Sequence, residues 1–258
     1  PTSHPPPPRA TWRRRESWRV CVSHALVAMC AWRCGAATNA ALIENLSKAR
    51  LITDPEVRRV LLAQDRRNYC QPGTAAYDDS PQRIGWNITI SAPHMHANAL
   101  QTLREQLRPG ARALDVGSGS GYLSVAMAQL VGPTGKAVGI DHIDELVQWS
   151  RANVARDGKQ GLLDSSQLKL LTRDGFAGYA EDAPYDCIHV GAAPERVPPA
   201  LKEQLKPGGV LLLPVGPAND QAFVRITRSA DGARYEEERL FSVRYVPLTT
   251  VEKQLSRF

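Results

Sequence analysis

The fold of this 258-residue chain is decided by one stretch, Ala113-Leu114-Asp115-Val116-Gly117-Ser118-Gly119-Ser120-Gly121. Its first four residues are typical of a buried strand, and residues 122–128, Tyr-Leu-Ser-Val-Ala-Met-Ala, are typical of a helix. Glycine permits positive φ angles and lets a ligand approach backbone N–H groups without a Cβ in the way. A strand, a glycine turn and a helix start predict a nucleotide cradle, although an ordinary tight strand-to-helix turn uses the same residues.

The spacing of the glycines bears on which nucleotide binds. They occupy positions 117, 119 and 121, whereas the dinucleotide fingerprint G-x-G-x-x-G places its third glycine one position later. Asp115 precedes the first glycine by two residues, where a carboxylate would repel a diphosphate but attract a cation. S-adenosylmethionine has no phosphate and carries a sulfonium, an ammonium and ribose hydroxyls. The pattern therefore favours S-adenosylmethionine over NAD.

Two further apolar segments end in a carboxylate. Residues 137–141 end in Asp141, and an acidic residue after the second strand of such a unit takes ribose hydroxyls. Residues 168–175 carry Asp174 and Gly175 at their end, with Asp174 placed to accept from an adenine amino group. Each aspartate alone could be a helix N-cap. Ligands of open α/β sheets bind at the carboxyl edge, so the three together predict an S-adenosylmethionine pocket there.

The remaining pattern predicts an α/β fold of Rossmann-like type. Strand and helix signals alternate from residue 111 to residue 215, which predicts a right-handed, mainly parallel sheet with helices on both faces. Residues 206–209 form a turn into a buried strand at 210–214. Residues 222–227 and 241–246, around a turn at Asp231-Gly232, predict an antiparallel closing pair.

Two helices and a loop are expected before the sheet. Residues 40–49 place three apolar side chains on one helical face, and a second helix begins at Asp54-Pro55-Glu56, where aspartate can cap and proline suits the first position. Residues 71–90 are rich in Gly, Pro and Asp and predict a loop that leads into an extended segment at 87–90. A third helix is expected from Pro93 to Leu107.

Polar residues at the start of that third helix raise two questions. Ser91 is predicted to cap it, which would place the hydroxyl at a helix N-terminus, where an anion would also bind. His94 and His96 are two residues apart and point in different directions on a helix. No third histidine or carboxylate lies nearby in the sequence, so we expect no metal site.

Length, charge and cysteine usage narrow the class of protein. A chain of 258 residues with 43% hydrophobic residues can bury the core of one α/β domain with additions, and no apolar run is long enough to span a bilayer. The net charge is +6, of which residues 1–35 carry +5, so the rest lacks a basic surface for nucleic acid. The five cysteines have neither zinc nor disulfide spacing, and we expect a reducing cytosol.

The first 30 residues are expected to be a disordered extension. They combine a proline run at 5–8 with an arginine cluster at 13–15 and have no helical or strand period. Residues 18–32 loosely resemble a signal peptide, but Ser23 and His24 interrupt the apolar stretch and no small-x-small cleavage site follows. A solvated tail or an upstream translated extension is the preferred interpretation.

Five blocks resemble the protein-L-isoaspartate (D-aspartate) O-methyltransferase family. The most specific are Thr89-Ile90-Ser91-Ala92-Pro93-His94-Met95-His96 and Tyr245-Val246-Pro247-Leu248-Thr249, and the others are 114–121, 184–186 and 188–193. The resemblance covers about Ala31 to Gln254. It implies an S-adenosylmethionine-dependent methyltransferase domain at 31–258, with a helical, substrate-side segment at 31–110 and a methyl-donor-binding α/β core at 111–258.

The resemblance also implies an activity. Such enzymes methylate the free α-carboxylate of L-isoaspartyl residues in damaged proteins, and more weakly the side-chain carboxylate of D-aspartyl residues. The ester closes to a succinimide that reopens partly to normal aspartate. A carboxylate is already ionised at neutral pH, so alignment and exclusion of water matter more than a strong base. We expect a monomer that acts on isoaspartyl proteins and peptides and needs no metal, nucleic acid or membrane.

Residue roles follow from the same resemblance. Ser91 is the active-site residue that contacts the substrate carboxylate, and Val246, Pro247 and Leu248 contact the peptide backbone. Asp115 and the glycine loop hold the methionine part of the methyl donor, Asp141 its ribose and Asp174 its adenine. The implied cofactor-binding residues are Ile88, Thr89, Ile90, His96, Asp115, Gly117, Ser118, Gly119, Ser120, Gly121, Asp141, His142, Asp174, Gly175, Thr249 and Gln254.

Other functions are left open by the residues themselves. Cys187 and His189 lie on an apolar strand, where a core position is favoured over a chemical role. A methyltransferase with another acceptor would share the glycine loop. A non-catalytic or nucleic-acid-binding module would use the arginine-rich tail, and an NAD oxidoreductase would need the other glycine spacing.

Overall fold

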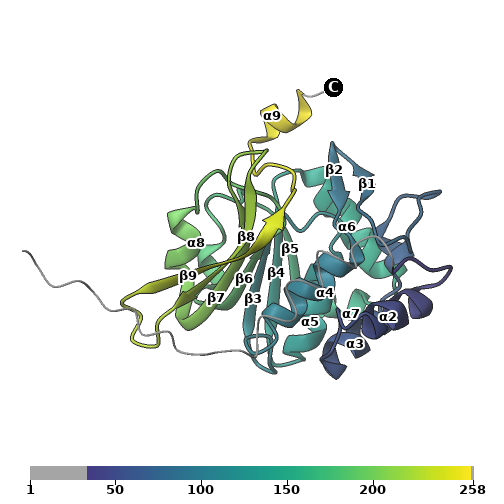
Figure 1. Cartoon of the computed structure of the whole chain (residues 1–258), viewed down its shortest axis with the longest axis horizontal. Helices are drawn as coiled ribbons and strands as arrows, with labels where there is room; N and C mark the ends of the chain where they lie inside the picture. Colours follow the sequence, from purple (N-terminus) through teal and green to yellow (C-terminus); the bar gives the residue numbers. More distant parts are fainter. Residues whose placement is uncertain (1–33, 257–258) are drawn as a thin grey trace, which may run out of the picture.

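A seven-stranded sheet forms the centre of the structure, a computed structural model that describes residues 34–256 (Figure 1). The strand order is β5-β4-β3-β6-β7-β8-β9, parallel from β5 to β7 and antiparallel from β7 to β9. This confirms the predicted mainly parallel sheet with an antiparallel closing pair. The last strand lies at Tyr235–Val243 instead of 241–246, and residues 206–209, expected to form a turn, belong to β7. Residues 1–30 lie outside the described part. The strands are β3 (Arg112–Val116), β4 (Lys136–Asp141), β5 (Leu168–Thr172), β6 (Tyr185–Val190), β7 (Leu205–Val215), β8 (Gln221–Arg228) and β9 (Tyr235–Val243).

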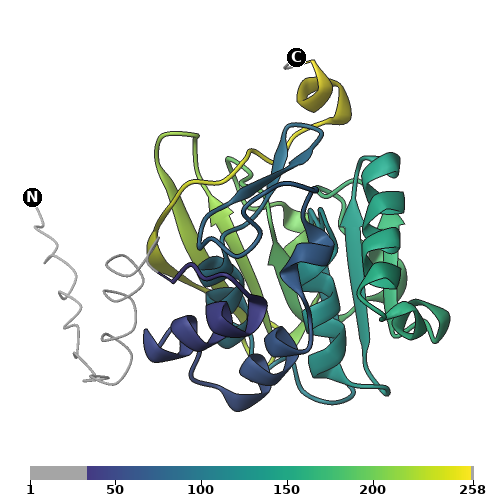
Figure 2. The same ribbon diagram turned by 90° about the vertical axis from the view of Figure 1, so that its right-hand side faces the viewer.

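Apolar residues cover both faces of the sheet because alternate side chains of a strand point to opposite sides. On β3, Ala113 belongs to one apolar cluster, whereas Leu114 and Val116 belong to the other. The first cluster receives α5, α6 and α7, and the second receives α8, so helices cover both faces as predicted (Figure 2). These helices are α5 (Tyr122–Val131), α6 (Asp144–Arg156), α7 (Gln160–Asp164) and α8 (Pro199–Glu203), and a 3-10 turn, η2, spans Ala180–Asp182.

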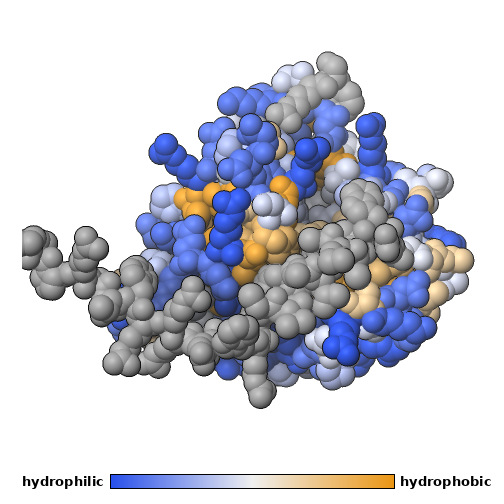
Figure 3. Space-filling model, in the orientation of Figure 1, coloured by the Kyte–Doolittle hydropathy of each residue, from blue (hydrophilic) through white to orange (hydrophobic). Residues whose placement is uncertain are grey.

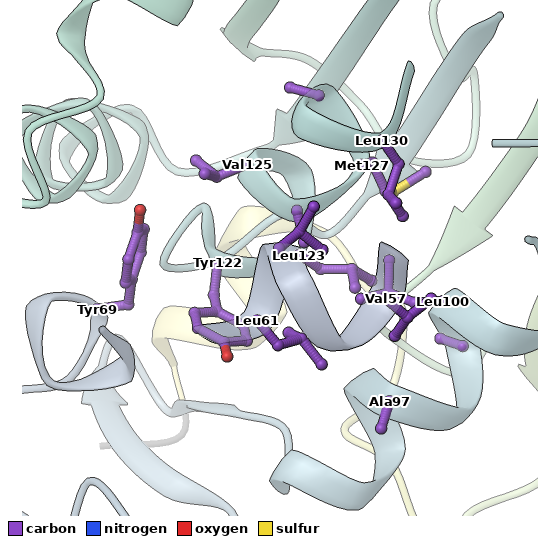
Figure 4. Packing of buried hydrophobic residues seen from close by; sticks show 14 of the residues in the cluster. Val57, Leu61, Tyr69, Ala97, Leu100, Tyr122, Leu123, Val125, Met127 and Leu130 are labelled. Atoms are coloured by element: carbon purple, nitrogen blue, oxygen red, sulfur yellow. The ribbon is translucent and has the colours of Figure 1, made fainter. Parts of the chain in front are cut away.

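The segment before the sheet adds a layer of helices on the α5 side. Asp54 accepts hydrogen bonds from the N–H groups of Glu56 and Val57, which confirms the predicted helix start. Figure 4 shows Leu61 of α3 and Leu100 of α4 close to α5. No helix within residues 34–256 is long and apolar enough to cross a membrane. The elements are α2 (Asn39–Lys48), α3 (Pro55–Leu62), the 3-10 helix η1 (Arg66–Tyr69) and α4 (Pro93–Thr102).

Residues 82–90 form a hairpin that the sequence did not predict. β1 (Gln82–Gly85) pairs antiparallel with β2 (Ile88–Ile90), whereas a loop was expected up to an extended segment starting at Asn87. Gly85, Trp86 and Asn87 have φ angles of 97°, 48° and 59°, so Asn87 belongs to the turn. The segment around β1 is polar and rich in glycine, so its composition did not predict this four-residue strand.

The helix that begins at Pro93 is shorter than predicted. It ends at Thr102 instead of Leu107, and residues 103–107 form separate turns. Arg104 donates one hydrogen bond to the Leu107 carbonyl and another to Asp54, which holds these turns in place. Both Leu103 and Leu107 remain buried. Their apolar spacing fits the predicted helix and the observed turns equally well.

Removing Leu61 from the layer between α3 and α5 should destabilise the fold. The side chain is 1% exposed, so Leu61→Ala leaves a cavity that the neighbouring helices fill only partly. We expect a loss of about 2–5 kcal/mol in the free energy of unfolding, measured by urea denaturation. Leu62→Ala, the same change at a half-buried position on α3, should cost less; equal losses would contradict this packing account.

Candidate functional site

A cavity opens at the carboxyl ends of β3, β4 and β6. We call it the edge cavity. It lies where open α/β sheets bind small-molecule ligands. Its lining comprises Ile88, Thr89, Gly117, Gly119, Ile140, Asp141, His142, Gly175, Gly191, Ala192, Val246, Pro247, Leu248, Thr249 and Gln254.

The glycine loop gives this cavity a wall made of backbone. Gly117, Gly119 and Gly121 have φ angles of 72°, 54° and 84°, a region that residues with a Cβ rarely adopt. The N–H groups of Gly117 and Ser118 both donate to the carbonyl of Ile140, which fixes the loop to the end of β4. A ligand in the edge cavity therefore meets main-chain atoms of the loop directly.

Asp141 is the carboxylate on the cavity wall. Its side chain accepts from the N–H of Gly119 at 3.1 Å and from that of Ile143 at 3.4 Å. Burial raises its pKa, and the hydrogen bond from Gly119 acts in the opposite direction. A carboxylate accepts about four hydrogen bonds, so acceptor positions remain for the hydroxyls of a ligand.

The other two predicted carboxylates have different surroundings. Asp115 lies within β3 and is buried, with one oxygen accepting from the Ser124 hydroxyl at 2.5 Å and the other bonded to His189 Nδ1 at 2.8 Å. Asp174 is exposed and accepts from the Phe176 N–H at 2.9 Å. Neither is among the residues that line the edge cavity, so their contact with the ligand stays a prediction. An aspartate inside a strand points to a face of the sheet, and here that face is occupied by α5.

Several other predicted cofactor-binding residues are also not part of the cavity lining. His96 is buried, accepts from Arg66 Nη1 at 3.4 Å, and has its ring 5.0 Å from that of Tyr122. Burial, followed by the neighbouring Arg66, lowers the pKa of His96 well below its ordinary value, so the ring is neutral. The remaining residues of this group are Ile90, Ser118, Ser120 and Gly121.

The C-terminal helix closes one side of the edge cavity. α9 (Val251–Leu255) carries Gln254, whose Oε1 bonds with His142 Nε2 at 3.0 Å and whose Nε2 donates to the Trp86 carbonyl at 3.0 Å. Asn87 returns a hydrogen bond to the Gln254 carbonyl. These contacts join α9 to the turn after β4 and to the β1–β2 hairpin, near the top of Figure 1.

A second cavity adjoins the first, and we call it the Ser91 cavity. The two share Thr89, Gly191 and Val246. Apolar residues are visible between hydrophilic ones in the part of the surface where β9 ends (Figure 3). The lining of the Ser91 cavity comprises Pro81, Thr89, Ser91, Ala92, His94, Met95, Gly191, Phe241, Ser242, Val243, Arg244, Tyr245 and Val246.

Ser91 does not cap α4, contrary to the prediction. Ala92 occupies the N-cap position without a side-chain hydrogen bond, and Asp79 accepts from the N–H of His94 instead. The Ser91 hydroxyl forms a hydrogen bond with Tyr245; burial raises the pKa of that phenol, and the bond with Ser91 acts in the opposite direction. The Ser91 carbonyl accepts from Arg66 Nη2 at 2.8 Å. Ser91 is therefore held from both its backbone and its side chain.

Residues 246–248 separate the two cavities. The Ala193 N–H donates to the Val246 carbonyl at 2.8 Å, and the Leu248 N–H donates to the Ala193 carbonyl at 2.9 Å. Val246, Pro247 and Leu248 all line the edge cavity, and Val246 also lines the Ser91 cavity. The Val246 carbonyl and the Leu248 N–H are already hydrogen-bonded to Ala193, so this segment would bind a peptide through its other atoms.

Sequence reasoning missed several residues of the site. Gly191 lies where a Cβ would come within 2.9 Å of the Gly117 carbonyl oxygen, so only glycine permits this approach of the β6 end to the glycine loop. The sequence feature that could have indicated Gly191 is its place directly after an apolar strand. Arg66 and Tyr245 gave no chemical signal, because they contact Ser91 only after folding. Within residues 34–256 no group of three or more His, Cys, Asp or Glu side chains could hold a metal.

Comparisons with known proteins identify relatives of this chain. The family model described as protein-L-isoaspartate(D-aspartate) O-methyltransferase matches residues 37–253. Protein-L-isoaspartate O-methyltransferases from Triticum aestivum and Caenorhabditis elegans are 48% and 43% identical, covering 84% and 88% of this chain and 94% and 99% of theirs.

A solved structure is similar in fold as well as in sequence. It is described as a protein-L-isoaspartate O-methyltransferase from Plasmodium falciparum in complex with S-adenosyl-L-homocysteine. The TM-score is 0.76 at 34% identity, over 83% of this chain and 99% of that one. By its sequence and its fold, this chain belongs to the protein-L-isoaspartate(D-aspartate) O-methyltransferase family.

Proposed function

We propose that this enzyme transfers a methyl group from S-adenosylmethionine to the free α-carboxylate of L-isoaspartyl residues, and more weakly to D-aspartyl residues, in damaged proteins. One observation carries the proposal: the edge cavity and the Ser91 cavity adjoin and share Thr89, Gly191 and Val246. Family membership supports the same chemistry. A methyl donor in the first cavity would lie next to an acceptor in the second.

The residues of the edge cavity fit S-adenosylmethionine. Asp141 offers acceptor positions for ribose hydroxyls, and the glycine loop presents backbone without side chains. His142, Gly175, Thr249 and Gln254 complete the lining on the side of α9 and β5. The Plasmodium relative binds S-adenosyl-L-homocysteine, the demethylated form of the same molecule. When bound, S-adenosylmethionine supplies an electrophilic methyl group on its sulfonium.

The predicted residues outside this lining retain an indirect role in the proposal. Asp115 holds Ser124 of α5 and His189 of β6 behind the glycine loop and would position that loop. His96 contributes a neutral ring packed beside Tyr122 and Arg66. Asp174 orders the turn that brings Gly175 to the cavity by accepting from the N–H of Phe176.

The Ser91 cavity fits the acceptor. The nucleophile is an ionised carboxylate, so the protein needs to bind and align it and to exclude water. Ser91 is placed to donate its hydroxyl hydrogen to that carboxylate, while Tyr245 and Arg66 fix the position of Ser91. Val246, between the cavities, would contact both ligands. The ester formed then cyclises to a succinimide without further help from the enzyme.

The proposal also covers the partners, the cellular compartment and the oligomeric state of the enzyme. Residues 36–258 carry a net charge of only +1, which supports peptides and proteins as partners and gives no basis for a nucleic acid. Cys70 and Cys187 form no disulfide, which supports a reducing compartment such as the cytosol. We propose a monomer that acts without a metal ion, since its acceptor needs no activation.

A paired assay tests the proposed function. The purified chain and radiolabelled S-adenosylmethionine are incubated with an isoaspartyl peptide or with the same peptide containing normal aspartate. We expect methyl incorporation into the first and little into the second, because only the isoaspartyl linkage presents a free α-carboxylate at this place. Equal incorporation would favour a methyltransferase with another acceptor; donor binding without any incorporation would favour a non-catalytic module.

Ser91→Ala tests the acceptor site. Loss of a hydrogen bond to a charged group should lower kcat about tenfold or more, while the Kd for S-adenosylmethionine changes by less than about threefold. Steady-state kinetics with the isoaspartyl peptide and calorimetry with the methyl donor measure the two effects. Ser47→Ala, which removes a hydroxyl from α2, should change neither. Unchanged turnover in Ser91→Ala would refute its assigned role.

Asp141→Asn tests the methyl-donor site. The amide keeps the shape of the side chain but loses the charge and one acceptor oxygen, so the Kd for S-adenosylmethionine should rise about tenfold. Calorimetric titration measures it. Asp144→Asn, which neutralises an exposed carboxylate at the start of α6, is the matched control and should bind normally. Equal affinity of the two variants would remove Asp141 from the site.

A further inference from the structure

We propose that His94, held by Asp79, recognises the charge of the substrate carboxylate in the Ser91 cavity by donating a hydrogen bond from Nε2. This inference rests on the proposed function and names a positioning residue, Asp79, and a substrate-binding residue, His94. The family resemblance implies a cofactor-binding role for His96 and none for His94, and the structure gives the two rings different surroundings.

The geometry fixes one end of the His94 ring. Asp79 Oδ1 accepts from the His94 backbone N–H at 3.0 Å and lies 2.8 Å from His94 Nδ1. A carboxylate only accepts, so Nδ1 carries a proton. His94 lines the Ser91 cavity, and its Nε2 forms no hydrogen bond with any residue in the described part of the chain. Nε2 is therefore the ring atom left for a ligand.

Asp79 is buried beside His94 and bonds to it. The Asp79 side chain is 0% exposed, and its Oδ2 has no partner among the described residues. A buried carboxylate is costly without a hydrogen-bond donor beside it, and the His94 ring is that donor. A ring with protons on both nitrogens donates to Asp79 from Nδ1 and to a substrate carboxylate from Nε2.

Arg66 adds a second positive charge on the same side of the site. Its guanidinium is fully buried and donates to the carbonyls of Ala76 and Ser91 and to His96, none of which is negatively charged. Within the described part of the chain, no carboxylate is hydrogen-bonded to this guanidinium. An entering substrate carboxylate would balance this charge, whereas an amide or an ester would not. The arrangement therefore favours the unmethylated acid over its methylated product.

Asp79 also caps α4, so its structural role must be separated from its role in recognition. Asp54 provides the comparison, because it caps α3 through the N–H groups of Glu56 and Val57 and pairs with Arg104. Asp54 does not line either cavity. Asp54→Asn and Asp79→Asn thus make the same chemical change at two helix starts, of which only one touches a residue of the Ser91 cavity.

The test compares His94→Gln, Asp79→Asn, their double variant and Asp54→Asn. The measurements are kcat and KM for an isoaspartyl peptide, Kd for S-adenosylmethionine, and inhibition by the same peptide with its α-carboxylate replaced by a carboxamide. We expect His94→Gln and Asp79→Asn each to raise the peptide KM about tenfold, with the Kd for the methyl donor within twofold. Both variants should also discriminate less between the isoaspartyl peptide and its carboxamide analogue.

Coupling between the two residues distinguishes recognition from folding. Because Asp79 acts through His94, the double variant should be little worse than His94→Gln alone. Both cap variants should lower the melting temperature, but Asp54→Asn should leave the peptide KM and the acid preference unchanged. If Asp79→Asn does not fold, His94→Gln and the carboxamide comparison decide the question.

Two results would overturn the inference, and they are distinguishable. If His94→Gln keeps the wild-type KM and acid preference while the wild-type chain methylates the isoaspartyl peptide, His94 has no part in recognition and the proposed function stands. If the wild-type chain binds S-adenosylmethionine but methylates no isoaspartyl peptide, the proposed function fails, and the role of His94 fails with it.

Discussion

The carbonyl oxygen of Ile140 accepts hydrogen bonds from the N–H groups of both Gly117 and Ser118, at 2.8 and 3.0 Å, and the architecture of the site depends on this contact. It fixes the glycine loop after β3 to the end of β4. On the other side of β3, the Gly191 N–H donates to the Val116 carbonyl at 2.7 Å. Three strand ends are thereby held at one edge, and the space between their loops is the edge cavity.

The second cavity depends on segments far apart in the sequence. Arg66, from the helical layer before the sheet, donates to the backbone of Ser91, and Tyr245, beyond the last strand, bonds to its hydroxyl. Residues 246–248 then bind Ala193 at the end of β6. Because the same short segment lines both cavities, a shift of the C-terminal region would alter methyl-donor and acceptor binding together.

The sequence predicted most of the fold, because each signal for it was local. Alternating apolar strands, the three glycines and the Asp54 cap act within a few residues of one another, and the structure has each of them. The site was less predictable. Asp115 was expected to face the ligand, but its orientation depends on Ser124 and His189, which come from other elements.

Charge gives the two adjoining cavities opposite characters. Asp141 lines the edge cavity, which suits a cationic sulfonium donor. His94 lines the Ser91 cavity and Arg66 donates to the Ser91 carbonyl, which suits an anionic acceptor. Burying such groups without a close partner costs stability, and replacement of buried charges by apolar residues often stabilises a protein. Arg66 is bonded only to neutral groups, and in the proposed function a carboxylate bound beside Ser91 would bring a negative charge close to it.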